Sequence, residues 1–146
     1  MSGFDRLESE HGNLRTAITW LDATGRLDDL AELLLRVKSL WYHTGPNHAE
    51  GLKWFERVLD RHAGMSDSVR GELLLCAGHL AQSLGKPGAN VYLEEALSLV
   101  QASGDIGQQA RTMEMLAVMA EDRGDYYDAE RRFRSARDLY EQTAEG

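Results

Sequence analysis

The chain has 146 residues, a formal net charge of −8, 42% hydrophobic and 27% charged residues, and one cysteine. This acidic composition lacks the clustered Lys and Arg that contact phosphates, so direct nucleic-acid binding is not expected. No apolar run approaches the roughly 20 residues of a membrane span, residues 1–5 do not resemble a signal peptide, and Cys76 cannot form an intrachain disulfide, so we expect a cytoplasmic protein with no membrane partner.

The first predicted helix carries one stripe of side chains at three- and four-residue steps. Five are apolar and one is an imidazole: Phe4, Leu7, His11, Leu14, Ile18 and Leu21. This spacing places them on one face of a long amphipathic helix. Gly25 follows and is expected to end the helix, because glycine is the usual residue at a helix C-terminus.

Two further helices are predicted over residues 27–42 and 48–62, separated by Gly45-Pro46-Asn47. Their inward positions are Leu30, Leu34, Val37 and Trp41 in the first, and Leu52, Phe55, Val58 and Leu59 in the second. A fourth helix begins at Ser66 or Asp67, either of which can serve as its N-cap. Its apolar run contains Cys76, which we expect to be buried and unreactive.

The remaining helices are divided by Gly85-Lys86-Pro87-Gly88, Gly104 and Gly124-Asp125. Asp105 is expected to cap the sixth helix, and the seventh carries Tyr126, Ala129, Phe133, Ala136 and Tyr140. No segment shows the period-two alternation of a strand.

Turn and packing residues recur about every 40 residues, as expected of a repeat protein. Glycines return at Gly45, Gly85 and Gly124, and bulky residues at Phe55, Leu93 and Phe133. Each bulky residue is expected to fill the gap between one helix pair and the next, because a single pair cannot bury both of its faces.

The pattern Gly-Asp-Tyr-x-x-Ala-x-x-x-Phe-x-x-Ala at residues 124–136 resembles the second half of a tetratricopeptide repeat. The resemblance implies an all-α, right-handed α-solenoid of antiparallel helical hairpins with about seven helices. It implies a single domain over residues 1–146, with an N-terminal helix at 1–25 and repeats at 27–64, 66–104 and 105–143.

Residues 7–21 resemble the segment that opens the helical region of LuxR-type and related ATPase regulators of bacterial transcription. Those regulators carry an ATPase module before this region, but this sequence contains no Gly-x-x-x-x-Gly-Lys-Ser/Thr phosphate loop. The resemblance therefore implies a protein–protein interaction module related to a sensor region.

Catalytic and metal sites are not predicted. The histidines show neither a His-Glu-x-x-His pattern nor a pair at i, i+4, and adjacent acids such as Glu121-Asp122 splay apart on a helix. No serine lies in a nucleophile elbow. We expect no enzymatic activity and no cofactor.

The resemblance also implies that the first helix of each hairpin lines a concave groove that binds a peptide or partner protein. The residues expected to face this groove are Glu32, Ser39, Tyr42, His43, Glu72, His79, Gln82, Ser83, Arg111, Glu114, Glu121 and Asp122. The alternative is that these are ordinary exposed helix residues.

Two other functions remain open at this stage. A small effector could bind in the superhelix, with Tyr42 and Trp41 as its aromatic lining. The last helix could instead mediate homodimerisation, because Tyr127, Leu139 and Tyr140 are expected on a face that no following repeat covers.

Overall fold

The computed structural model describes the backbone of residues 3–43 and 45–145 and, within these, the side chains of residues 12–42 and 47–144. The described residues form helices and no strand, which confirms the all-α class. The helices are α1 (Gly3–Ala23), α2 (Leu27–Arg36), α3 (Lys38–His43), α4 (Gly45–Arg61), α5 (Asp67–Ser83), α6 (Ala89–Ser103), α7 (Ile106–Asp122) and α8 (Tyr126–Glu145).

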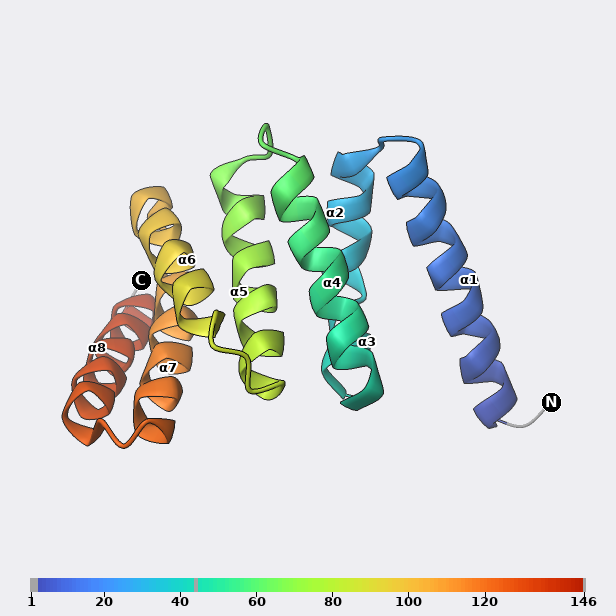
Figure 1. The fold of residues 1–146 in the computed structure, drawn as a ribbon. Helices are drawn as coiled ribbons and strands as arrows, with labels where there is room; N and C mark the ends of the chain where they lie inside the picture. Colours follow the sequence, from blue (N-terminus) through green and yellow to red (C-terminus); the bar gives the residue numbers. More distant parts are fainter. Residues whose placement is uncertain (1–2, 44, 146) are drawn as a thin grey trace.

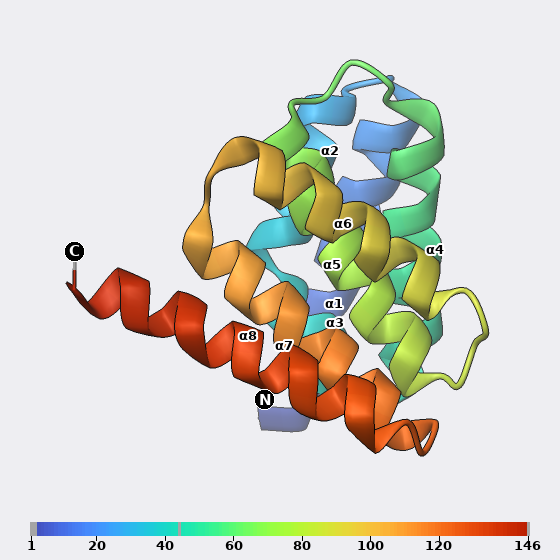
Figure 2. The ribbon, with the colours of Figure 1, turned by 90° about the vertical axis from the view of Figure 1, so that its left-hand side faces the viewer.

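The helices stand side by side in a row that follows chain order from α1 to α8 (Figure 1). Extensive contacts join helices that are close in the chain: α5 packs mainly on α4 and α6, and α7 packs mainly on α6 and α8. Figure 2 views the row from the end that α8 covers. Within the described residues the architecture is therefore an open row and not a closed bundle.

The single helix predicted over residues 27–42 is two helices in the structure, α2 and α3. The described residues therefore form eight helices, where about seven were expected. Val37 leaves helical geometry, with φ −104° and ψ 16°. The Leu40 amide donates to the carbonyl oxygen of Val37, three residues back, at 2.9 Å. A bond of this 3₁₀ type tightens the turn, and the β-branched side chain of valine lowers its helix propensity. Both α2 and α3 pack against α4.

The helix starts and ends follow local signals. Ser66 is the N-cap of α5, since its Oγ accepts a hydrogen bond from the Val69 amide at 3.2 Å. Asp105 caps α7 in the same way, through the Gln108 amide at 3.1 Å. Gly25 ends α1 with a positive φ of 72°, which a side chain would strain.

The break predicted at Gly45-Pro46-Asn47 is displaced. Helix α4 already begins at Gly45, so Pro46 and Asn47 belong to its first turn and not to a loop before it. Proline fits there because the amide that it lacks would have no intrahelical partner.

The core runs along the row and contains most of the inward side chains predicted over residues 27–62, together with apolar side chains of α1 and of α5 to α8. These are Ile18, Leu30, Leu34, Trp41, Leu52, Phe55, Val58, Leu59, Leu73, Leu74, Ala77, Leu80, Ala81, Ala89, Leu93, Ala96, Val100, Ala110, Leu116, Ala117, Ala120, Ala129 and Ala136. Val37, Leu84 and Met113 are half-buried. On α8, Ala129 and Ala136 are buried, whereas Tyr126, Phe133 and Tyr140 are exposed, so Phe133 does not fill a gap between helix pairs as expected.

Helix α1 packs on α2 and forms ion pairs with α4. Arg15 Nε donates to Glu50 Oε1 at 2.8 Å. Asp22 Oδ1 accepts from Arg57 Nε at 2.8 Å and also pairs with Arg61. The hydrogen bond from Arg57 lowers the pKa of Asp22 and keeps its carboxylate ionised.

None of the described helices combines the length and the apolar character that crossing a membrane would require.

Candidate partner-binding groove

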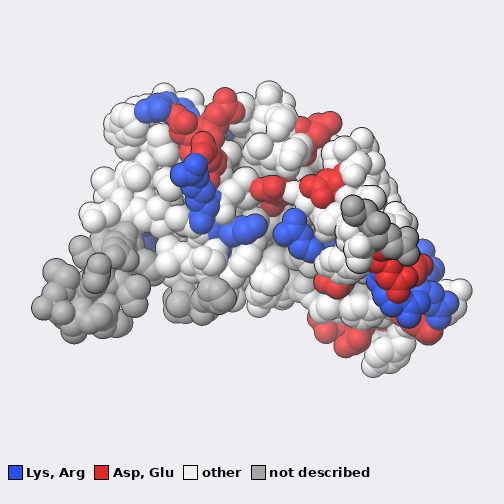
Figure 3. All heavy atoms as spheres, turned by 180° about the vertical axis from the view of Figure 1, so that it is seen from behind, with Lys and Arg blue, Asp and Glu red and all other residues white. Residues whose placement is uncertain are grey.

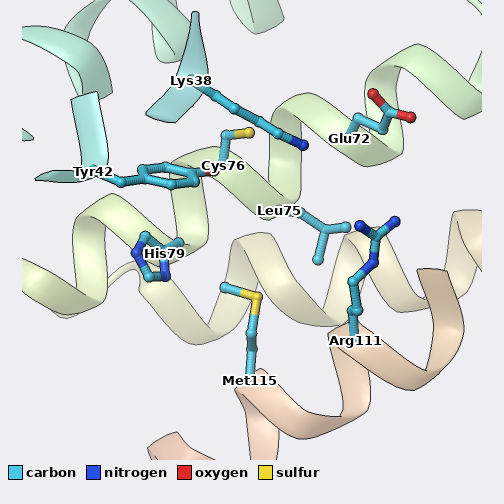
Figure 4. A pocket seen from close by; sticks show the side chains of 8 residues that line it. All are labelled: Lys38, Tyr42, Glu72, Leu75, Cys76, His79, Arg111 and Met115. Atoms are coloured by element: carbon cyan, nitrogen blue, oxygen red, sulfur yellow. The ribbon is translucent and has the colours of Figure 1, made fainter. Parts of the chain in front are cut away.

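A pocket lies at the centre of the molecule between α3, α5 and α7. It is lined by Lys38, Tyr42, Glu72, Leu75, Cys76, His79, Arg111 and Met115 and has a volume of about 170 Å³ (Figure 4). We call it the central pocket. Three helices that are separate in sequence supply its walls, so it depends on their stacking and not on any one of them.

Two larger hollows adjoin the central pocket. The α2–α5 hollow, of about 570 Å³, is lined by Asp28, Ala31, Glu32, Leu35, Arg36, Gly64, Met65, Ser66, Val69 and Glu72. The α5–α7 hollow, of about 460 Å³, is lined by His79, Gln82, Ser83, Glu114, Met115, Val118 and Asp122.

The central pocket lies between the two hollows. It shares Glu72 with the α2–α5 hollow, and it shares His79 and Met115 with the α5–α7 hollow. The two hollows share no residue with each other, so the three are adjoining parts of one depression with the central pocket in the middle. We call this depression the groove. Figure 3 shows basic and acidic side chains side by side across the middle of the molecule, seen from behind.

Two rings form one wall of the central pocket. The Tyr42 and His79 rings lie with centroids 4.5 Å apart and an interplanar angle of 56°, which joins α3 to α5. His48 Nε2 lies 2.9 Å from the Tyr42 carbonyl oxygen. Burial raises the pKa of Tyr42, so its phenol stays neutral and keeps its proton. Burial, with the nearby charge of His48, lowers the pKa of His79.

Cys76 lies at the base of the pocket and is almost fully buried. Burial raises the pKa of its thiol, although the hydrogen bond with Tyr42 and the charge of Lys38 act in the opposite direction. The raised pKa keeps the thiol protonated at neutral pH, and the thiolate is the reactive form of cysteine. The expected burial is confirmed.

Charged groups surround the apolar surface of Leu75. Figure 4 shows Lys38 reaching in from α3 and Arg111 from α7, with Glu72 beside them on α5. The Glu72 carboxylate accepts a hydrogen bond from Gln108 Nε2 at 2.9 Å, which ties α5 to α7. Within the described residues, neither Lys38 nor Arg111 forms an ion pair with this carboxylate.

The α5–α7 hollow is polar at its far end. Gln82 Nε2 donates to Asp122 Oδ2 at 3.2 Å, so this contact also links α5 to α7. Ser83 Oγ donates to the carbonyl oxygen of His79 at 3.1 Å. Glu114 lies on α7 in the same hollow. This part of the groove presents carboxylates beside the apolar side chains of Met115 and Val118.

The structure brings most of the predicted groove residues together. Those that line the groove are Glu32, Tyr42, Glu72, His79, Gln82, Ser83, Arg111, Glu114 and Asp122. Ser39 and Glu121 are exposed outside the three hollows. The side chain of His43 lies outside the described residues. Whether the lining residues bind a partner stays a prediction.

Sequence reasoning missed Lys38, Leu75, Cys76 and Met115 as lining residues. All four are four positions from a residue that was predicted: Lys38 from Tyr42, Leu75 from His79, Cys76 from Glu72, and Met115 from Arg111. Residues at i and i+4 share a helix face. Extending each predicted face by one turn would therefore have found them.

Trp41 does not line the groove, which corrects the expectation that it could form an aromatic wall with Tyr42. Its side chain is fully buried against α4, where a Cβ built on Gly51 would lie 2.9 Å from the Trp41 side chain. Trp20 lies on α1 and is 53% exposed, with the Arg26 guanidinium 5.4 Å from its ring centroid.

Cations, carboxylates, a neutral phenol, an imidazole and apolar side chains face the groove. Within the part of the chain that the structure describes, no three His, Cys, Asp or Glu side chains gather in a group that could hold a metal ion. Comparison with protein-family models and with curated proteins finds no match to this sequence.

Proposed function

We propose that this chain is a non-catalytic protein–protein interaction module that binds a peptide or a segment of a partner protein in the groove. In this proposal the row is a tetratricopeptide-like, right-handed solenoid of antiparallel hairpins, with α2–α3, α5 and α7 as the first helices. We further propose a relationship to the sensor region of a bacterial transcriptional regulator, on the likeness of residues 7–21 noted above.

One observation carries the proposal: three adjoining hollows lie across α2, α3, α5 and α7 and have both polar and apolar walls. A row of hollows with charged groups and apolar side chains such as Leu75 and Met115 suits a flexible polar segment. The central pocket alone, at about 170 Å³, is smaller than the several hundred Å³ of a usual small-molecule site, so it would hold only one side chain or group of a longer ligand.

The test replaces Tyr42, His79 and Arg111 by alanine together and compares proteins recovered from the source cells by affinity capture and mass spectrometry. Loss of the partners that the unchanged chain recovers is expected. The control replaces Lys53, Ser98 and Gln101, which are exposed outside the groove, and should keep those partners. Retention of every partner by the groove variant, with an unchanged melting temperature, would contradict the proposal.

A second candidate function is homodimerisation through α8. Tyr127 is 81% exposed, and Tyr126, Phe133 and Tyr140 are exposed on the same helix. Burying these side chains against a second copy would remove apolar surface from water. Sedimentation velocity should then show a dimer that Phe133→Glu converts to a monomer. A monomer at high protein concentration would eliminate this function.

A further inference from the structure

The central pocket holds an arginine that has no anionic partner. Arg111 is the one arginine, among those whose side chains the structure describes, that forms no ion pair. Those that do are Arg15, Arg26, Arg36, Arg57, Arg61, Arg70, Arg123, Arg131, Arg132, Arg134 and Arg137. Lys38 converges on the same pocket (Figure 4). In a chain of net charge −8, two unpaired cations at one point mark a place for an anionic group.

The two hollows on either side have the opposite charge. The α5–α7 hollow is lined by Glu114 and Asp122 and by no Lys or Arg. In the α2–α5 hollow, the carboxylates of Asp28, Glu32 and Glu72 outnumber the one cation, Arg36. Glu72 also lines the central pocket, where the two cations Lys38 and Arg111 outnumber it. The net charge of the lining residues along the groove therefore runs from negative to positive to negative.

We infer that the groove takes an extended peptide segment in which one acidic side chain lies between basic side chains. This inference rests on the proposed function and gives the chemistry of its partner. The acidic side chain lies between Lys38 and Arg111, where the guanidinium can bind a carboxylate through two hydrogen bonds. Basic side chains on either side extend into the acidic hollows, and their aliphatic stems pack on Leu75, Met115 and Val118.

Two other occupants fit the same charges less well. A nucleic-acid strand carries a phosphate at every nucleotide and would place negative charge against both acidic hollows. A free inorganic anion would satisfy Lys38 and Arg111 but would leave the two hollows unfilled. An extended segment of alternating charge is complementary to all three parts of the groove.

The experiment selects a random 12-residue peptide phage library on the full chain and measures enriched peptides, labelled with fluorescein, by fluorescence anisotropy. We expect enriched peptides with a central Asp or Glu between Lys or Arg residues. Replacing the central acid by its amide should weaken binding about tenfold, because one charge-assisted contact is lost at a partly exposed site. Binding should also weaken as salt is added.

Variants of the two cations connect the peptide pattern to the pocket. Lys38→Gln and Arg111→Gln should each weaken binding of the enriched peptide about fivefold to tenfold. Lys53→Gln removes the same charge outside the groove and should leave the affinity unchanged. The double variant Lys38→Glu with Arg111→Glu makes the central pocket acidic. It should select peptides with a central basic residue, and a merely destabilised protein would not gain this new preference.

The outcomes separate the inference from the proposed function. If enriched peptides lose binding in Tyr42→Ala and His79→Ala variants, but lack the charge pattern and ignore changes at Lys38 and Arg111, the inference is wrong and the proposed function stands. If no peptide is enriched over a surface without protein, both are contradicted.

Discussion

Leu93 and Phe133 occupy corresponding places in successive helix pairs, but they lie in opposite environments. Leu93 on α6 is fully buried against α5, where a Cβ built on Gly78 would lie 2.6 Å from its Cδ2. Phe133 on α8 is 38% exposed. The α5–α6 joint lies inside the row, whereas α8 covers one end of it (Figure 2). The comparison shows that burial at this position depends on what lies beyond the pair as well as on the repeat pattern.

The largest expected effect is at the inner joint. Leu93→Ala should lower the free energy of unfolding by about 2–5 kcal/mol, because it removes buried methyl groups and leaves a cavity. Urea unfolding measures this change. Val91→Ala on the same helix, at an exposed position, should stay within about 0.5 kcal/mol. A loss below about 1 kcal/mol at Leu93 would mean that the joint is loosely packed.

Gly78→Ala tests the same close packing of α5 on α6, but from the α5 side. The added methyl would overlap the fully buried side chain of Leu93, so we expect a loss of about 1–3 kcal/mol despite the higher helix propensity of alanine. Combining it with Leu93→Ala should cost less than the sum of the two changes. Gly12→Ala is the control, since nothing lies within 4 Å of its added Cβ, and it should stabilise by up to about 1 kcal/mol.

The outer position should be more tolerant. Phe133→Ala should lower the free energy of unfolding by about 1 kcal/mol, because a ring that already contacts water loses less on removal than a buried one. Urea unfolding at low protein concentration measures it. A loss as large as that of Leu93→Ala would show that Phe133 is buried in solution, and would favour coverage of α8 by a second copy.

The smallest expected effect is a pH dependence at His79, which follows Gly78 in the chain but lines the central pocket. Burial holds the pKa of folded His79 below the ordinary value of 6.5, so the unfolded chain binds more protons as the pH falls past that value. The stability due to neutral His79 is present above pH 6.5 and is lost as the pH falls toward the folded pKa. Urea midpoints measured at steps between about pH 7.5 and pH 5 should decrease less in His79→Gln. An unchanged pH profile would contradict a depressed pKa.

The sequence predicts those features that are decided locally. The caps at Ser66 and Asp105 and the positive φ at Gly25 depend on a few neighbouring residues, and the buried face of α5 follows from helical spacing. The break at Val37 could not be predicted in this way, because both halves gain packing on α4, which lies later in the chain.

The groove was predictable in part, because helix faces follow from the spacing of residues along the chain. Once the helix faces are known, Tyr42, His79 and Arg111 fall on the sides that meet. What could not be read from the sequence is that Arg111 has no ion-pair partner, because pairing depends on the positions of carboxylates on other helices. The exposure of Phe133 is also a property of the assembled row.

The open arrangement of the helices affects the order in which they unfold. Helix α5 contacts α2, α4, α6 and α7, whereas α1 and α8 each pack chiefly on one neighbour. In such quasi-one-dimensional stacks the ends can unfold while the middle stays folded. Native-state hydrogen exchange should therefore follow a gradient, with amides of α5 the slowest and those of α1 and α8 the fastest. The helix that carries Glu72 and His79 is then the most persistent part of the structure, and a ligand would meet it folded even while the ends fray.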